Sequence, residues 1–277
     1  MVFNENNKNM INKCKKKGIL IAAHRGTVGG NIIPNTNLSF QNALLHGADI
    51  VEMDLIMSKD GIFYAFHDGE EKKILNIDTD IREMNSKELE KLCCYNSLFL
   101  KTNKHLEKVS DVLLKLKNKC FINIDRSWFF WKETINFFEQ FDMGNQLILK
   151  SPVEEKLLDE LEKLNSNFMY MPIITDIDQW QLVKNRNINV VAAELVFDSL
   201  DSKVCSKEFI KELKDASILL WANSIVLDDT IILSGFLDDN NSIEFGFDKG
   251  WGKLIEMDFD IIQTDWPALL SNYIQNK

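Results

Sequence analysis

Short apolar runs rich in β-branched residues alternate along this chain with amphipathic segments. The apolar runs predict strands over residues 19–23, 50–57, 120–124, 146–150, 168–174, 190–197, 217–223 and 261–265. Amphipathic patterns predict helices over residues 38–46, 109–119, 128–141, 154–164, 177–186 and 207–214, and a last helix from about Pro267. Strands that alternate with helices are typical of a parallel sheet with right-handed crossovers. Eight such units predict an α/β fold, a (β/α)₈ TIM barrel.

One interval departs from this alternation. After the second strand and a short apolar run, the next helix begins only near residue 109, far beyond an ordinary connection. We interpret residues 69–107 as a small insertion packed over the barrel mouth, with a helical stretch over residues 86–92. No Pro/Gly/Ser-rich linker separates it, so we expect residues 1–277 to form a single domain. The polar, Lys-rich segment 4–17 is interpreted as a tail or a short helix.

Composition restricts the partners and the compartment. The net charge of −10 argues against a nucleic-acid partner, because phosphate backbones need a basic surface. The five cysteines show no C-x-x-C spacing and favour a reducing compartment over a disulfide framework. The chain shows no signal-peptide pattern, and no apolar run reaches the length of a membrane span. We therefore expect a cytoplasmic protein without stable membrane insertion, and its oligomeric state stays open.

Two acids interrupt the second predicted strand. Glu52 and Asp54 are two positions apart, which places both side chains on one face of a strand that is otherwise apolar. Two buried carboxylates on the same face repel each other unless a cation lies between them. A hard divalent ion with oxygen ligands is the simplest such cation. The pattern therefore predicts a metal site.

Polar residues follow several other predicted strands. His24 and His67 each end an apolar run just before a glycine-containing turn. In a TIM barrel the carboxyl ends of the strands form the catalytic face, so both imidazoles are candidates for proton transfer. Asp125 is a candidate third metal ligand. The other polar or aromatic residues at these ends include Arg25, Arg126, Lys150, Glu194, Trp221, Asn223 and Asp265.

Lys150 ends an apolar run, and a buried lysine needs an anionic partner. A salt bridge to Asp125 or Glu194 and a contact with a phosphate are both compatible with this position. A divalent ion, two histidines and two cationic side chains together suit the cleavage of a phosphodiester. The chain has no P-loop, no G-x-G-x-x-G motif and no H-E-x-x-H motif.

These residues resemble the motifs of the glycerophosphodiester phosphodiesterase family. The similar segments are His24-Arg25-Gly26, Asn35-Thr36, residues 40–54 and His67-Asp68, with weaker similarity at Trp221-Ala222-Asn223 and residues 264–267. The resemblance implies a TIM barrel with an insertion after the second strand, and a divalent cofactor, Mg²⁺ or Ca²⁺. It also implies that a small glycerophosphodiester is cleaved to sn-glycerol 3-phosphate and an alcohol.

The resemblance further implies roles by position. His24 and His67 correspond to the general acid/base pair, and Arg25 corresponds to a phosphate contact. Glu52 and Asp54 correspond to metal ligands, with Asp125 where the family usually has a glutamate. We add Lys150, Glu194 and Trp221 as expected substrate-binding residues.

The chain departs from the family pattern at three positions. Pro34 stands where the family has a glutamate, and Ser127 stands where it usually has a lysine. Arg126 and Lys150 are the alternatives for the missing lysine. Asp125 is one methylene shorter than the usual ligand.

Two other readings use similar residues. One is a related barrel phosphodiesterase that acts on phospholipids, as sphingomyelinase D-like or phosphatidylinositol phospholipase C-like proteins do. The absence of a signal peptide and of a visible apolar anchor in the sequence weighs against it. The other is a catalytically inactive barrel that binds a phosphorylated metabolite.

Overall fold

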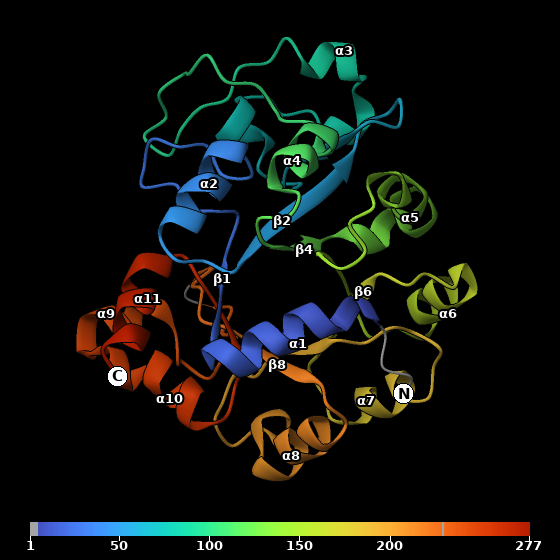
Figure 1. The fold of residues 1–277 in the computed structure, drawn as a ribbon. Helices are drawn as coiled ribbons and strands as arrows, with labels where there is room; N and C mark the ends of the chain where they lie inside the picture. Colours follow the sequence, from blue (N-terminus) through green and yellow to red (C-terminus); the bar gives the residue numbers. More distant parts are fainter. Residues whose placement is uncertain (1–4, 229) are drawn as a thin grey trace.

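A computed structural model describes residues 5–228 and 230–277, and their strands form a closed parallel barrel (Figure 1). The sheet order is β1-β9-β8-β7-β6-β5-β4-β2-β3, and β1 also pairs with β2, which closes eight parallel strands. The predicted TIM barrel is therefore confirmed. The barrel strands are β1 Leu20–Ala23, β2 Ile50–Met57, β4 Phe121–Asp125, β5 Leu147–Pro152, β6 Met169–Ile174, β7 Ala192–Leu195, β8 Leu219–Asn223 and β9 Ile261–Thr264.

Helices cover the outside of this barrel (Figure 1). They are α2 Asn37–Leu45, α4 Val109–Leu116, α5 Trp131–Phe138, α6 Glu155–Leu164, α7 Asp178–Val183, α8 Lys207–Asp215, α9 Asp239–Phe245, α10 Trp251–Glu256 and α11 Pro267–Gln275. The sequence pattern missed α9 and α10, which follow β8. The predicted helix 128–141 is divided, because 3₁₀ turns at Ser127–Phe130 and Glu139–Phe141 flank α5.

The sequence left a tail or a short helix open for the amino-terminal segment. Within the described residues, this segment forms a helix, α1 Glu5–Lys17. Its buried side chains Met10, Ile11 and Cys14 pack against the apolar residues that fill the barrel interior. Figure 1 shows α1 crossing the end of the barrel at which the parallel strands begin. Since α1 covers the end where β1 begins, the opposite end, formed by the carboxyl ends of the strands, is left for the site.

The segment after β2 leaves the barrel. The short strand β3 Phe63–Ala65 pairs antiparallel with the end of β2, so that β2 extends beyond the parallel sheet. A π-helical turn Glu71–Leu75, a 3₁₀ turn Ile81–Glu83 and α3 Ser86–Leu89 follow. Their apolar side chains form a separate small core with residues of β2 and β3. The insertion thus lies on the extended β2–β3 hairpin, next to α2 and α4 (Figure 1).

None of the described helices is long and apolar enough to cross a bilayer.

Candidate active site

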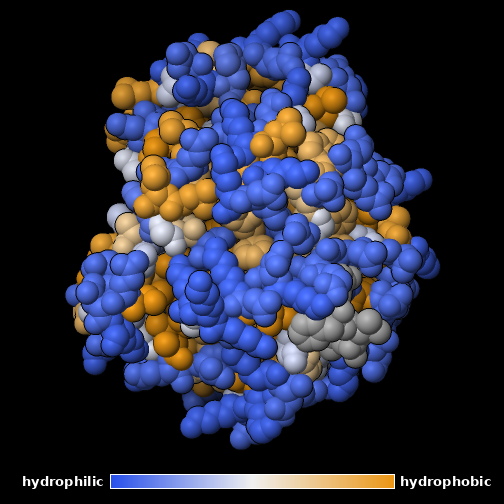
Figure 2. All heavy atoms as spheres, in the orientation of Figure 1, coloured by the Kyte–Doolittle hydropathy of each residue, from blue (hydrophilic) through white to orange (hydrophobic). Residues whose placement is uncertain are grey.

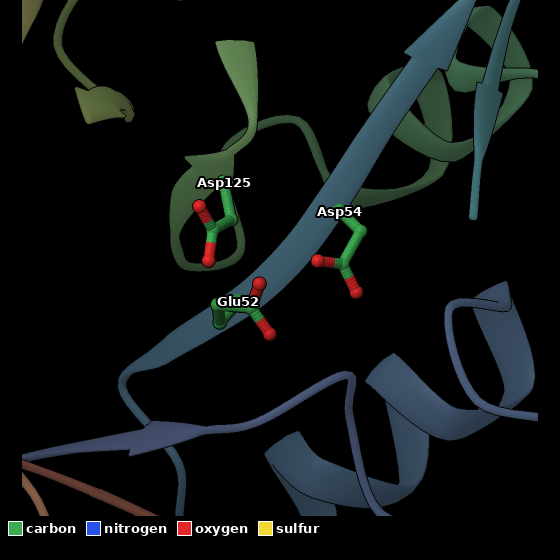
Figure 3. Close-up of side chains that lie close together, drawn as sticks. All are labelled: Glu52, Asp54 and Asp125. Carbon is green, nitrogen blue, oxygen red and sulfur yellow. The ribbon is translucent and has the colours of Figure 1, made fainter. Parts of the chain in front are cut away.

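Three carboxylates meet at the carboxyl ends of β2 and β4. The strand register pairs Asp54 with Asp125, and Glu52 lies two residues earlier on the same face as Asp54. One carboxylate oxygen from each residue lies within 4.8 Å of the others. Figure 3 shows the three side chains side by side. Glu52 and Asp54 are each only 1% exposed. The structure therefore brings together the three acids that the sequence nominated as metal ligands.

Cationic side chains neutralise part of this negative charge. The Arg25 Nε atom lies 3.1 Å from Asp54 Oδ2, and the Arg126 Nε atom lies 3.9 Å from Asp54 Oδ1. The Lys150 Nζ atom lies 2.8 Å from Asp125 Oδ2. Burial alone would raise the pKa of Asp125, but the Lys150 ammonium and the contacts with Arg126 together outweigh burial and lower it. Asp125 is therefore an anion at neutral pH.

Glu52 is the least compensated of the three acids. Its Oε2 atom accepts a hydrogen bond of 2.9 Å from the backbone N–H of Arg25, whereas its buried Oε1 atom has no hydrogen-bond partner among the described residues. Burial, together with the nearby charge of Asp54, raises the pKa of Glu52 to about 8. A buried, unpartnered carboxylate oxygen beside two further carboxylates fits a hard divalent cation.

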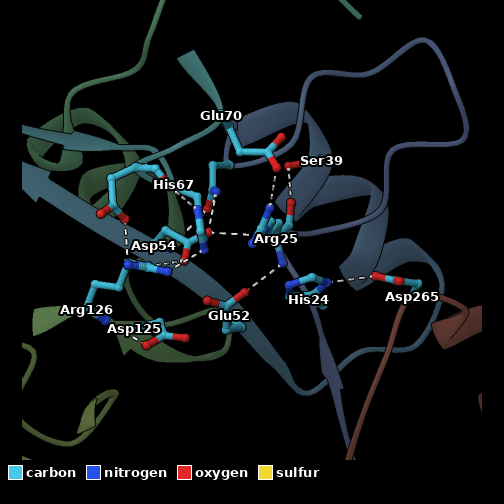
Figure 4. A network of polar contacts seen from close by, with 12 residues as sticks. His24, Arg25, Ser39, Glu52, Asp54, His67, Glu70, Asp125, Arg126 and Asp265 are labelled. Atoms are coloured by element: carbon cyan, nitrogen blue, oxygen red, sulfur yellow. Dashed lines mark hydrogen bonds and ion pairs between the residues drawn. The ribbon is translucent and has the colours of Figure 1, made fainter. Parts of the chain in front are cut away.

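The first histidine is held by an acid from the far end of the chain. His24 Nδ1 lies 3.0 Å from Asp265 Oδ1, which follows β9 (Figure 4). Burial would lower the pKa of His24, but the hydrogen bond with Asp265 and the charge of Glu52 outweigh burial and raise it. The imidazole of His24 thus favours the protonated state.

The second histidine has two different partners. The Nδ1 atom of His67 lies 2.6 Å from the backbone carbonyl of Asp68, which can only accept, so Nδ1 carries a proton. The Nε2 atom lies 2.7 Å from Arg126 Nη2, which can only donate, so Nε2 is the unprotonated nitrogen (Figure 4). These two hydrogen bonds select one neutral tautomer of His67.

Arg126 connects the histidine to the acids. Its Nη1 atom lies 2.6 Å from Asp68 Oδ1, and its backbone N–H donates to Asp125 Oδ1 over 2.7 Å. Ser127, in contrast, is fully buried, and its hydroxyl donates to the backbone carbonyls of Ile124 and Lys150. Arg126, and not Ser127, therefore supplies the cationic side chain that follows β4 in this site.

The residues predicted to bind substrate form a buried chain of contacts. Lys150 Nζ lies 3.1 Å from Glu194 Oε2, so the lysine bridges Asp125 and Glu194. The Asn223 amide donates to Glu194 Oε1, and the indole N–H of the fully buried Trp221 donates to Asn223 Oδ1, each over 2.8 Å. Both salt bridges considered for Lys150 are thus present, and contacts of Lys150, Glu194 and Trp221 with a substrate stay predictions.

Three residues of the site had no role assigned from the sequence. Asn35 has φ of 57°, and its side chain accepts from the backbone N–H of Asp54 and donates to Asp54 Oδ2 over 2.8 Å. In the sequence, Asn35 was indicated only by the Asn35-Thr36 pair that resembles a family motif. Asp265 stood in the motif-like segment 264–267, but its partner His24 was not apparent. No motif in the sequence indicated Asp239, which lies on α9.

Asp239 holds the carboxyl end of β9 in place through hydrogen bonds. Its carboxylate accepts hydrogen bonds from the Trp251 indole, the Thr264 hydroxyl and the backbone N–H of Asp265, at 2.7–2.9 Å. The residue is 2% exposed, and burial raises its pKa from 3.8 to about 7 despite these donors. Asp239 thus anchors the backbone that carries Asp265, the partner of His24.

We predict that Lys150→Met destabilises the protein by about 3–5 kcal/mol, because the buried Glu194 and the partly buried Asp125 lose their common cation. Urea unfolding of the metal-free protein measures this loss. The matched control is Lys115→Met, which replaces an exposed lysine on α4. Equal midpoints for the two variants would show that the buried ion pairs do not stabilise the fold.

We also predict a pH dependence of stability from Asp239. The folded protein retains a proton that the unfolded chain releases between about pH 4 and 7, so the free energy of unfolding falls as pH rises through this range. Asp239→Asn should remove this contribution and reduce the slope, whatever its effect on absolute stability. Thermal unfolding at several pH values measures the slope, and an unchanged slope would contradict the assignment.

Comparisons with known proteins agree with this geometry. A family model described as the glycerophosphoryl diester phosphodiesterase family matches residues 24–220, and a model described as a domain of unknown function matches residues 170–274. A glycerophosphodiester phosphodiesterase of Bacillus altitudinis is 26% identical over 142 residues. That match spans 51% of this chain and 52% of the relative, so it covers about half of each.

Solved structures show the same fold. A glycerophosphoryl diester phosphodiesterase from Parabacteroides distasonis superposes with a TM-score of 0.80 at 18% identity, over 99% of this chain and 93% of that one. An Oleispira antarctica phosphodiesterase, in complex with the product sn-glycerol-3-phosphate, has a TM-score of 0.66 at 17% identity, over 92% and 96%. With the family match over residues 24–220, this chain belongs to the glycerophosphoryl diester phosphodiesterase family.

Proposed function

We propose that the protein hydrolyses glycerophosphodiesters to sn-glycerol 3-phosphate and an alcohol in a metal-dependent reaction. One observation carries this proposal: the cluster of Glu52, Asp54 and Asp125 lies in one polar network with two oriented histidines (Figure 4). The family match and the product named for the Oleispira antarctica relative support the substrate class.

Glu52, Asp54 and Asp125 would hold the divalent ion, Mg²⁺ or Ca²⁺. When bound, such an ion supplies a Lewis acid toward a phosphate oxygen. Arg25 lies on the acid cluster, within 3.1 Å of Asp54, and is 17% exposed at its side chain. A guanidinium in this position can pair with a phosphate group through two parallel hydrogen bonds. We therefore keep Arg25 as the proposed phosphate contact.

The partners of the two histidines suggest their roles. His24 faces the carboxylates of Asp265 and Glu52, which favour its protonated form, so it is the proposed acid for the leaving alkoxide. His67 presents an unprotonated Nε2, so it is the proposed base for the attacking water. An anionic phosphate would attract the Arg126 guanidinium and leave this nitrogen free to accept a proton.

We propose that Lys150, Glu194 and Trp221 contribute to the substrate end of the site. The proposal for Lys150 is tested by kcat/KM of the Lys150→Met protein that remains folded. We also propose that residues 1–277 form one phosphodiesterase domain, because α1 and the insertion pack on the barrel. The five cysteines are free, which supports a reducing compartment such as the cytoplasm.

We predict that His24→Ala and His67→Ala each lower kcat for glycerophosphocholine by about 10²–10⁴-fold, because each removes a proton-transfer group. Release of glycerol 3-phosphate, measured with a coupled assay, gives the rates. His46→Ala, at the end of α2, is the matched control and should retain normal activity. If either site variant turns over at the control rate, that histidine has no catalytic role.

We predict that Asp54→Asn abolishes detectable binding of Mg²⁺ or Ca²⁺ in isothermal titration calorimetry, because the cluster loses one of its three anionic ligands. Asp111→Asn, at an exposed position of α4, should bind as the wild type does. EDTA should stop turnover, and added metal should restore it. Wild-type heats from the Asp54→Asn protein would place the ion elsewhere.

A further inference from the structure

Exposed apolar side chains occur on several loops that follow the barrel strands. Leu98, Phe99, Leu100, Phe129, Leu227 and Trp266 are between 47% and 71% exposed, and all lie in segments that follow barrel strands. These segments belong to the end of the barrel that α1 does not cover. The face that α1 covers is largely hydrophilic around that helix (Figure 2). Where exposed apolar side chains lie next to one another, they indicate a contact with another apolar surface.

A hairpin in the insertion presents three of these side chains side by side. Tyr95 pairs antiparallel with Lys101, and the buried Asn96 holds the tip. The Asn96 side chain accepts from the backbone N–H groups of Leu98 and Leu100, both over 3.0 Å. Leu98, Phe99 and Leu100 are nevertheless 60%, 71% and 60% exposed. The hairpin 95–101 is thus a turn held by hydrogen bonds that exposes three apolar side chains.

The hairpin adjoins the site. The Ser97 hydroxyl donates to the backbone carbonyl of Gly30 over 2.7 Å. Gly30 belongs to the loop between β1 and α2, which also carries Arg25 and Asn35, and both of these contact Asp54. A surface that covers the hairpin therefore lies next to the barrel mouth.

The sequence segment that carries the hairpin, between Glu90 and Glu107, has an excess of positive charge. Residues 91–106 contain three lysines, Lys91, Lys101 and Lys104, and neither Asp nor Glu, in a protein of net charge −10. All three lysines are exposed. Apolar side chains flanked by lysines are typical of segments that enter the headgroup region of an anionic membrane.

We propose that the hairpin 95–101 docks the catalytic face of the barrel on an anionic phospholipid surface. Leu98, Phe99 and Leu100 enter the interface, and the three lysines contact lipid phosphates. Three side chains on a projecting turn are far fewer than the roughly 20–30 residues per side of a stable protein interface, which favours lipid over a protein partner. The sequence pattern showed no apolar anchor, and the proposed one is only three residues long. This proposal concerns binding and does not depend on the reaction.

The test is co-sedimentation with vesicles of phosphatidylcholine alone and of phosphatidylcholine mixed with phosphatidylglycerol. Wild-type protein should sediment with the mixed vesicles. The variant Leu98→Ser/Phe99→Asn/Leu100→Ser should bind them about tenfold or more weakly, because it removes the inserted apolar surface. Asparagine suits position 99, where φ is 57°. Thermal unfolding and turnover of a soluble diester should be unchanged in this variant.

The matched control is Leu45→Ser/Leu114→Ser/Leu182→Ser, which removes three exposed leucines from α2, α4 and α7. This control should bind like the wild type. A second variant, Lys91→Gln/Lys101→Gln/Lys104→Gln, should lose the preference for phosphatidylglycerol, whereas Lys115→Gln/Lys132→Gln/Lys163→Gln should keep it.

Three results would overturn the proposal. The first is wild-type protein that stays in solution with both kinds of vesicle. The second is a hairpin variant that binds as tightly as the leucine control. The third is loss of self-association in the hairpin variant by analytical ultracentrifugation, without vesicle binding by the wild type, which would assign the hairpin to a second copy of the chain. If the hairpin variant unfolds early, the single variant Phe99→Asn serves for the same comparison.

Discussion

Repulsion among two buried carboxylates and a third, partly buried one dominates the carboxyl ends of β2 and β4. Glu52, Asp54 and Asp125 are brought within 4.8 Å by the register of two parallel strands, in an environment where an isolated anion is costly. Arg25 and Lys150 supply positive charge, but Glu52 keeps an unpartnered oxygen and a raised pKa. The negative charge of the cluster is therefore only partly neutralised. Under this condition, binding of a divalent ion is most favourable.

The two histidines depend on a second set of contacts behind them. His24 is oriented by Asp265, and the backbone of Asp265 is in turn held by Asp239 on α9. His67 is oriented by the carbonyl of Asp68 and by Arg126. One histidine faces carboxylates and the other faces a guanidinium, so their environments differ, and this difference supports the proposed roles of proton donor and proton acceptor.

The insertion links the site to the surface. It has its own small apolar core on the extension of β2, and it reaches the β1–α2 loop through Ser97. The same β2–β3 hairpin that carries this core leads directly into His67. The hairpin 95–101 is flanked by Cys94 and His105, which line the same pocket as Arg25 and His67.

Local pattern determined most of the barrel. Apolar runs bounded by glycine or charge predicted all eight barrel strands to within about two residues at each end, and Ile50–Met57 matched fully. The sequence pattern missed α9 and α10 because each is short, at seven and six residues, and α9 begins with four polar residues. The acids, both histidines and Arg25 were found because strand ends and period-2 spacing are local properties.

Pairings between distant residues were decided only by the closed barrel. Asp265 reaches His24 across 241 positions because β9 pairs with β1, and no local pattern contains that neighbour. Lys150 could be assigned a need for an anion, but only the register placed it between Asp125 and Glu194. Sequence alone thus determined which residues stand at strand ends, through periodicity and burial. The tertiary structure decided which of them touch, because contact depends on strand order and register.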